Sequence, residues 1–473
     1  MRDKALLTDL YQLTMINGYL EHDTANTEVV FDLFFRKQPG GEDFAIVAGL
    51  EQAVEYLQNL SFSESDIKYL KSLNLFGDKF FNAAENFKFT GDVYAMREGE
   101  IVFPQEPILI IKAPLYQAQL IETALLTIIN HQTLIATKAY KVTQETGGAV
   151  SEFGLRRAQG PDAGVYGARA SIIGGCTSTS NVLAGKLFDV PVSGTHSHSW
   201  VLSFSSELEA FESFAKLYPS KCVLLVDTYD TLRSGVPNAI KVFKKLREKG
   251  YEPIGIRLDS GDLAYLSKQA RKMLDEAGFP NAKIVASNDI DENIIASLNA
   301  QGAKIDLWGV GTKLITSYDN PSLGGVYKLS AIEDENNNLI PKMKLSDTQE
   351  KTTNPGFKTT YRLYDKDGMA VADLIALREE KFDTTKPLTI FHPVETWKRM
   401  TLEEYSMRDL MVKVFEKGKL IYKLPKIDEI VSYSKEKNKE IWSEYTRRLN
   451  PHIYKVDLST KLYNLKQKLL NEK

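Results

Sequence analysis

The segment from Tyr251 to Leu274, YEPIGIRLDSGDLAYLSKQARKML, joins a short apolar run to an amphipathic stretch through a cluster of polar side chains. Its first residues fit a buried strand, and the apolar residues after Asp262 recur at helical spacing. Arg257, Asp259 and Ser260 stand where the strand would end. In parallel α/β proteins ligands bind outside the carboxyl ends of the strands. The segment therefore predicts a strand, an active-site loop and a helix.

The same pattern recurs through the middle of the chain, so it predicts more than one unit. Apolar runs followed by polar or Gly-rich residues occupy 222–226, 254–258, 283–287 and 305–310. Segments with helical periodicity separate these runs, which indicates right-handed βαβ units and a parallel sheet or barrel. We expect the helical segment 206–217 and the Gly-punctuated segment 154–194 to supply earlier units.

The remainder of the chain has a different character. TEVVFDLFFRKQPGGEDFAIVAG predicts two strands around a Pro-Gly-Gly turn, and FTGDVYAMREGEIVFPQEPILIIKAP predicts further strands. These segments favour a separate antiparallel layer. We expect four parts: an N-terminal sandwich domain at 1–114, an α/β barrel at 115–330 that begins with a long helix, a polar linker with strands returning to the sandwich at 331–400, and a C-terminal helical segment at 401–473.

Composition narrows the possible partners. The net charge of the 473 residues is −3, with 43% apolar and 26% charged residues, so the chain lacks the basic field that nucleic acid or anionic membranes usually require. Only Cys176 and Cys222 are cysteines, which does not suit a disulfide framework or a clustered zinc site. The N-terminus lacks the apolar core of a signal peptide, and no segment has the apolar length of a membrane span. We expect a cytoplasmic protein that acts on a small molecule.

Two of the six histidines lie close together in SGTHSHSW. His196 and His198 would share one face of a strand and could chelate a metal, although further ligands are not evident nearby. A neutral imidazole can also act as a nucleophile or proton carrier. From the residues alone, a structural pair and a catalytic role remain equally open.

Other polar clusters follow the predicted strands. Guanidinium groups bind phosphate or carboxylate in bidentate fashion, carboxylates suit magnesium or ribose hydroxyls, and Gly-rich turns expose amides to phosphate. Each cluster also has a plain interpretation, as surface arginines, helix caps or tight turns. The residues concerned are Arg156 and Arg157, Asp227 and Asp230, Gly309, Gly311 and Thr312, and Gly324 and Gly325.

Together these clusters are more specific than any one of them. Arginines, aspartates, glycines and a histidine at successive strand ends suit a substrate with a sugar and several phosphates. A magnesium-dependent barrel lyase or aldolase and a non-catalytic nucleotide sensor are the alternatives from other functional classes.

The motifs LLTDLYQLTM, EFGLRRAQGPD, GTHSHSW, IGIRLDSGDL and GVGTKL with SLGGVYKL resemble, in order, those of nicotinate phosphoribosyltransferases. They span Leu6 to Leu329. The resemblance implies a type II phosphoribosyltransferase fold, an irregular α/β barrel joined to an open α/β sandwich. It also implies a homodimer with shared active sites. The implied reaction joins nicotinate to 5-phosphoribosyl 1-diphosphate. ATP is the co-substrate, coupled through a phosphohistidine, and Mg²⁺ is held mainly by the diphosphate.

The resemblance also implies roles for individual residues. His198 would be phosphorylated, because the family motif runs Gly, Thr, two variable residues, His, and places His196 at a variable position. The other implied contacts are Tyr11, Thr195 and Arg257 with nicotinate, Gly311, Thr312, Gly324 and Gly325 with the ribose phosphate, and Arg156, Asp227 and Asp259 around the ribose and diphosphate.

Selectivity among pyridines is predicted from charge. A pocket with an arginine and no facing carboxylate favours an acid, whereas an added aspartate would favour an amide. The segment CTSTSNVLAG offers Ser180 and Asn181 and no acid. This favours nicotinate, with a nicotinamide- or quinolinate-specific member of the same fold as the nearest alternative.

Overall fold

The computed structural model describes residues 4–36, 44–146, 149–346, 352–395 and 397–472. The chain divides into two compact units. Unit 1 combines Met1–Leu134 with Ser322–Lys473, and unit 2 is Ile135–Pro321. The division falls inside the long helix α6 (Glu122–Thr146). The predicted barrel boundaries at 115 and 330 therefore differ from the observed ones, because part of the long helix packs in unit 1.

Unit 2 is built on a six-stranded sheet in the order β7-β6-β11-β10-β9-β8. All its strand pairs are parallel, so their carboxyl ends lie at one edge. The strands are β6 (Val150–Glu152), β7 (Ser178–Thr179), β8 (Val223–Leu225), β9 (Gly255–Leu258), β10 (Lys283–Asn288) and β11 (Leu307–Val310). The predicted succession of strands is confirmed.

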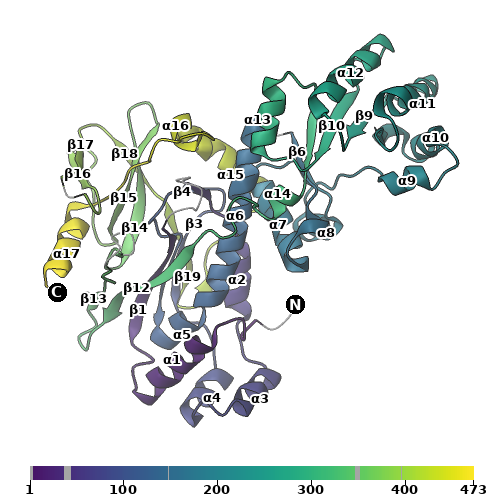
Figure 1. Ribbon diagram of the computed structural model, residues 1–473. Coiled ribbons are helices and arrows are strands. Elements are labelled where there is room, and N and C mark those ends of the chain that lie inside the picture. The colour runs from purple at the N-terminus through teal and green to yellow at the C-terminus, as the bar shows by residue number, and fades with distance from the viewer. Residues whose placement is uncertain (1–3, 37–43, 147–148, 347–351, 396, 473) are drawn as a thin grey trace. The chain divides into compact units, whose positions relative to one another are not determined.

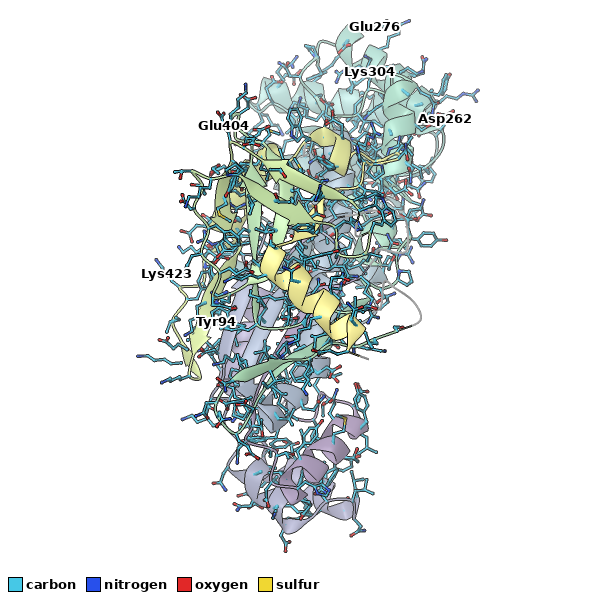
Figure 2. The ribbon with its side chains drawn as sticks, turned by 90° about the vertical axis from the view of Figure 1, so that its left-hand side faces the viewer. Tyr94, Asp262, Glu276, Lys304, Glu404 and Lys423 are labelled. Atoms are coloured by element: carbon cyan, nitrogen blue, oxygen red, sulfur yellow. The ribbon has the colours of Figure 1, made fainter. Side chains whose placement is uncertain are left out.

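Helices connect these strands, as the periodicity predicts (Figure 1). Side-chain caps start several of them: Asp262, labelled in Figure 2, accepts a hydrogen bond from the Tyr265 amide, at 2.9 Å. The helices are α7 (Pro161–Ile173), α8 (Val182–Phe188), α9 (His198–Leu202), α10 (Glu207–Leu217), α11 (Val236–Glu248), α12 (Leu263–Glu276), α13 (Glu292–Ala300) and α14 (Thr312–Ile315), with the short turns η1 (Leu155–Arg157), η2 (Pro219–Lys221) and η3 (Thr231–Gly235).

The segment 190–196 links the two outer strands of this sheet. Val192 forms a parallel bridge with Thr179, at the end of β7. Four residues later, the His196 imidazole accepts a hydrogen bond from the Leu225 amide of β8 through Nε2, at 3.2 Å. One short segment thus contacts both outer strands of this partly closed sheet, and that segment leads directly into α9.

Unit 1 contains the predicted antiparallel layer, a seven-stranded sheet in the order β13-β12-β1-β5-β3-β19-β20. Its main core lies between this sheet and helices from the first part of the chain. The strands are β1 (Glu28–Phe35), β3 (Asp92–Met96), β5 (Leu109–Pro114), β12 (Gly325–Glu333), β13 (Leu339–Pro341), β19 (Met411–Glu416) and β20 (Lys419–Leu420). The helices are α1 (Leu10–Glu21), α2 (Leu50–Asn59), α3 (Glu64–Ser72), α4 (Asp78–Glu85) and α5 (Leu115–Leu120).

The C-terminal part differs from the prediction. Most strands of 331–400 form a second sheet, in the order β17-β16-β21-β15-β14-β18, instead of rejoining the first. Within 331–400, β13 does rejoin the first sheet by pairing with β12, and β19 with β20 also joins that sheet from inside the region predicted as helical. The elements are β14 (Lys358–Tyr364), β15 (Ala370–Leu377), β16 (Leu388–Phe391), β17 (Arg399–Leu402), β18 (Ser406–Asp409), β21 (Val456–Leu458), α15 (Ile427–Lys437), η5 (Asn438–Glu440), α16 (Ser443–Thr446) and α17 (Thr460–Asn471).

One physical reason explains this difference. The short strands carry many charged residues, and these residues find their partners inside the fold. In the sequence alone, such polar segments resemble solvent-exposed helices. Arg362 of β14, for example, is fully buried and donates to Asp373 of β15 and to Glu100. Tyr94, labelled in Figure 2, likewise stacks under the Arg378 guanidinium, at 4.0 Å from the ring centroid.

The first predicted hairpin has both of its strands, but they do not pair with each other. Its Pro-Gly-Gly turn lies outside the described residues, but β1 and β2 (Ala45–Ile46) belong to different sheets, because β2 pairs with β4 (Ile101–Val102). By contrast, β14 and β15 form a hairpin around Asp365–Gly368, in which the two strands pair directly. Within the described ranges, no helix combines the length and apolar character needed to cross a bilayer.

Candidate active site at the carboxyl edge of the parallel sheet

Polar side chains gather at the carboxyl edge of the unit 2 sheet. Asp259 directly follows β9, Asp227 follows β8 by two residues, and Gly311 directly follows β11. Because the strands are parallel, these positions share one edge of the sheet. The structure brings together Thr195, His198, Asp227, Arg257 and Asp259 through hydrogen bonds and ion pairs.

Arg257 is the centre of this group. Its side chain, 13% exposed, donates from Nη1 to Thr195 Oγ1 at 3.0 Å and from Nη2 to Asp259 Oδ1 at 3.0 Å. Nε donates to Ser287 Oγ at 2.8 Å. The Phe153 ring lies 5.9 Å from the guanidinium. Three separate chain segments therefore fix the orientation of one cationic group.

Asp259 is held in its ionised form. Burial by itself would raise the pKa of its carboxyl, but the hydrogen bond from Ser287 and the positive charge of Arg257 outweigh burial and lower the pKa below its ordinary value. The backbone amide of Asp259 donates to Asp227 Oδ2 at 2.8 Å, and Ser260 Oγ donates to the same oxygen at 2.6 Å. The edge therefore carries two adjacent carboxylates with different partners.

Asp227 retains one unused acceptor. Its Oδ1 atom is buried, and no described residue donates to it. A buried carboxylate oxygen without a donor is a costly feature unless a ligand supplies the missing partner. Among the described residues no group of three or more His, Cys, Asp and Glu side chains is arranged to hold a metal ion by itself.

His198 opens α9 and faces this carboxylate group. Its Nδ1 atom shares a hydrogen bond with Thr228 Oγ1 at 3.0 Å, and Nε2 lies 3.6 Å from Asp259 Oδ2. The side chain is 40% exposed. A partly exposed imidazole whose two nitrogens face a hydroxyl and a carboxylate has the orientation that a nucleophile or proton carrier requires.

His196 has a different environment. It is buried, packs edge-on against Phe214 with ring centroids 4.8 Å apart, and accepts the Leu225 amide through Nε2. Burial, with the nearby positive charge of Arg257 adding to it, lowers the pKa of its imidazole to about 4. The imidazole is therefore neutral near neutral pH, and its contacts make it a structural residue.

Arg156, Gly311 and Thr312 lie at neighbouring strand ends of the same sheet. Arg156 is exposed on η1, just after β6, and Thr312 begins α14 after Gly311. A side chain at position 311 would approach the Phe153 carbonyl oxygen to 3.2 Å. Within the described residues none of the three is hydrogen-bonded to the Arg257 group, so the structure places them at the same edge without joining them to that group.

Glu152 adds a buried acid that sequence reasoning overlooked. It ends β6, accepts a 2.5 Å hydrogen bond from Thr179 Oγ1 and another from the Gly154 amide. Burial raises the pKa of its carboxyl despite these two hydrogen bonds. Ser180 and Asn181 follow Thr179 directly, so the segment predicted to lack an acid lies beside Glu152. The Glu152 carboxylate is already occupied by donors of the protein itself.

Three predicted residues belong to unit 1. Tyr11 lies on α1 with 51% of its surface exposed. Gly324 has a φ of +70°, which favours glycine, and Gly325 begins β12. A Cβ atom on Gly325 would lie 2.1 Å from Asn130 Oδ1, so a larger residue at this position would displace the Asn130 side chain.

Sequence reasoning missed Ser287 and Thr228, which hold the reactive group together. Strand register could have identified Ser287, because Ala286 pairs with Leu258 and the next residues along are Ser287 and Asp259. From the sequence, Asp230 is predicted either to bind magnesium or ribose or to cap a helix. The structure supports the cap, since Asp230 Oδ1 accepts the Arg233 amide at 2.8 Å and the Leu232 amide at 3.1 Å.

The chain is similar to known proteins over nearly its whole length. Nicotinate phosphoribosyltransferase family models match residues 6–130 (N-terminal domain), 149–374 (family) and 357–466 (C-terminal domain). A nicotinate phosphoribosyltransferase of Bacillus subtilis is 49% identical over 470 residues, 99% of this chain and 95% of that protein. The corresponding Dictyostelium discoideum protein is 36% identical, covering 97% and 87%.

Solved structures agree. The human nicotinic acid phosphoribosyltransferase structure has a TM-score of 0.88 at 32% identity, covering 98% of this chain and 100% of that one. A nicotinate-nucleotide pyrophosphorylase structure from Pyrococcus furiosus, 22% identical, has a TM-score of 0.71 over 93% and 96% and shows a shared fold. These likenesses confirm the predicted type II phosphoribosyltransferase fold. The chain belongs to the nicotinate phosphoribosyltransferase family.

Proposed function

We propose that this chain transfers the 5-phosphoribosyl group of 5-phosphoribosyl 1-diphosphate to the ring nitrogen of nicotinate, releasing diphosphate and nicotinate mononucleotide. The observation that supports this most strongly is the joined group of Arg257, Asp259 and His198 at the carboxyl edge of a parallel sheet. A cation for an acid, carboxylates for a sugar and an imidazole 3.6 Å from one of those carboxylates all lie in one group of side chains.

Arg257 is the proposed partner of the nicotinate carboxylate. A guanidinium has five N–H donors, and three of those on Arg257 are used by Ser287, Thr195 and Asp259. Two remain, one on each terminal nitrogen. Two donors match the two oxygens of a carboxylate, and the low exposure of the side chain strengthens such a pair.

The carboxylates suit the bond that breaks. Cleavage at the anomeric carbon develops positive charge on the ribose and negative charge on the departing diphosphate. Asp259, kept ionised by Arg257 and Ser287, would favour the cationic sugar. Asp227 Oδ1 fits a magnesium ion that is held mainly by the diphosphate, and the ion would neutralise charge on the leaving group.

The proposed role of His198 is to couple the transfer to ATP. One imidazole nitrogen would attack the terminal phosphorus of ATP and release ADP, and water would later remove the phosphoryl group. Its exposure and its contacts with Thr228 and Asp259 support this role, whereas the burial of His196 opposes such a role for that residue. This reasoning selects the same histidine as the family motif.

A variant tests the coupling. We expect His198→Ala to retain some transfer and to lose stimulation by ATP, while His452→Ala, which changes an exposed histidine of unit 1, behaves as wild type. Intact-mass spectrometry after incubation with ATP should show an added phosphoryl group on wild type and on His452→Ala only. Undiminished ATP stimulation of His198→Ala would refute the assignment.

A homodimer with shared active sites completes the proposal. Helix α8 exposes Val182, Leu183 and Leu187, with exposed fractions from 53% to 72%. Such an apolar group suits contact with a second copy. Leu183→Asp should shift the mass measured by light scattering from twice 53.2 kDa towards 53.2 kDa.

We place the enzyme in the cytoplasm, which is supported by two buried, free cysteines.

A competition assay tests the substrate. Equal concentrations of nicotinate, nicotinamide and quinolinate are offered with 5-phosphoribosyl 1-diphosphate, magnesium and ATP, and products are identified by mass spectrometry. Nicotinate should be consumed in preference to the other two, because Arg257 has two free donors and Glu152 is occupied by Thr179 and Gly154. Preferential turnover of nicotinamide or quinolinate would overturn the proposed substrate.

A further inference from the structure

Ser287 lies between the two charged groups of the site. It is buried at 3% exposure near the carboxyl end of β10. On one side it pairs with Gly309 of β11, and a Cβ atom on that glycine would lie 3.4 Å from the Ser287 Cβ. On the other side it is level with Asp259. The serine therefore has its hydroxyl directed along the edge between β9 and β10.

The hydroxyl has one proton, and the surrounding groups determine where it goes. Arg257 Nε can only donate, so Ser287 Oγ accepts from it, at 2.8 Å. The ionised Asp259 can only accept, so the hydroxyl proton goes to Asp259 Oδ1. The Leu258 carbonyl oxygen, at 3.4 Å, is the more distant acceptor. Ser287 is consequently a polarised bridge from guanidinium to carboxylate.

This bridge limits how Arg257 meets Asp259. An arginine beside a carboxylate usually forms two parallel hydrogen bonds, which here would use Nε and Nη2. In the structure only Nη2 reaches Asp259, because Nε is taken by Ser287. Removal of the hydroxyl would free Nε, and the fork with Asp259 could then close. Closure would turn the guanidinium and redirect its two unused donors.

We propose that Ser287 is a positioning residue that keeps Arg257 from closing onto Asp259 and so holds two N–H groups free for the carboxylate of the substrate. This rests on the proposed function, in which that carboxylate belongs to nicotinate. Ser287 itself touches no substrate in this account. Its effect therefore falls on the binding of the acid more than on the phosphoribosyl donor.

The test compares Ser287→Ala with Ser287→Thr and with Ser267→Ala. Ser267 is a matched control, because it is a fully buried serine of unit 2 whose hydroxyl, among the described residues, is hydrogen-bonded to the Ala264 carbonyl and the Lys304 amide alone. We expect Ser287→Ala to raise KM for nicotinate about 10- to 100-fold, the range for loss of a hydrogen bond to a charged group. KM for 5-phosphoribosyl 1-diphosphate should change less than about 3-fold. Ser287→Thr, which keeps the hydroxyl, should restore KM to within about 3-fold of wild type.

Two results would overturn the inference. One is an unchanged KM for nicotinate in Ser287→Ala. The other is a rise in that KM that is not specific, because KM for 5-phosphoribosyl 1-diphosphate rises equally in Ser287→Ala or because KM for nicotinate rises equally in the Ser267→Ala control. A crystal structure of Ser287→Ala decides independently of turnover, since it should show both Asp259 oxygens paired with Nε and Nη2. A single contact there refutes the spacer role even if the wild type does not use nicotinate. Absence of turnover by the wild type refutes only the proposed function.

Discussion

The neutral, buried imidazole of His196 makes the stability of the protein depend on pH in a defined way. Its pKa is lowered from an ordinary value of 6.5 to about 4 in the folded state, chiefly by burial. Folding therefore favours the neutral form, whose Nε2 accepts the Leu225 amide. Protonation destroys this acceptor. The contribution is fully present above the unfolded pKa of 6.5 and is lost as pH falls towards 4.

The size of this effect follows from the two pKa values. Proton linkage gives a loss of about 1.4 kcal/mol by about pH 5.5 and about 2.5 kcal/mol by about pH 4.5, relative to about pH 7.5. His196→Gln supplies an amide oxygen as acceptor that does not titrate in this range. All other titrating groups are common to both proteins and cancel in the difference. The variant should therefore be less stable than wild type at neutral pH and lose less stability on acidification.

Urea denaturation at these three pH values, followed by tryptophan fluorescence, measures the difference directly. We expect the difference in unfolding free energy between wild type and His196→Gln to shift in favour of the variant by about 2.5 kcal/mol from about pH 7.5 to about pH 4.5. A difference that stays constant over this range would refute the assignment of a buried neutral imidazole. It would also remove the main reason for preferring His198 as the reactive histidine.

Three further changes give separable outcomes. Asp259→Asn should lower kcat about 100-fold or more in steady-state assays, because the site loses the charge that we propose to stabilise the cationic sugar; an unchanged kcat would exclude that role. Lys138→Met should destabilise the fold by about 3–5 kcal/mol in urea denaturation, because it leaves the buried Glu292 carboxylate, 2.7 Å from the lysine Nζ, without its partner; a loss below about 1 kcal/mol would contradict this. Asp230→Ala should cost about 1 kcal/mol through loss of a cap and leave kcat unchanged; a large fall in activity would instead indicate contact with a ligand.

Sequence patterns predicted the parts of the fold that depend on local periodicity. The βα units of unit 2 were predictable because buried parallel strands are continuous apolar runs and their helices have a regular apolar face. The C-terminal sheet was not, because its short strands hold charged residues that are satisfied only by distant partners. Arg362, for example, pairs with Glu100, 262 residues earlier in the chain.

The same distinction applies to the site. Asp259 and Asp227 were predictable because polar residues that follow apolar runs lie at the carboxyl edge of the sheet, and Arg257, although part of β9, is a charged residue next to that edge. Ser287 and Glu152 belong to the strands themselves, where a polar residue reads as part of an apolar run. The separate roles of His196 and His198 depend on contacts with β8 and with Thr228 that no local pattern contains.

The most direct test of the account is to incubate the purified protein with nicotinate, 5-phosphoribosyl 1-diphosphate and magnesium, with and without ATP. Mass spectrometry then follows both the small molecules and the protein. The account predicts nicotinate mononucleotide and diphosphate in equal amounts, a faster reaction with ATP, and a phosphoryl group that peptide mapping places on His198. Absence of nicotinate mononucleotide under all these conditions would contradict the central claim.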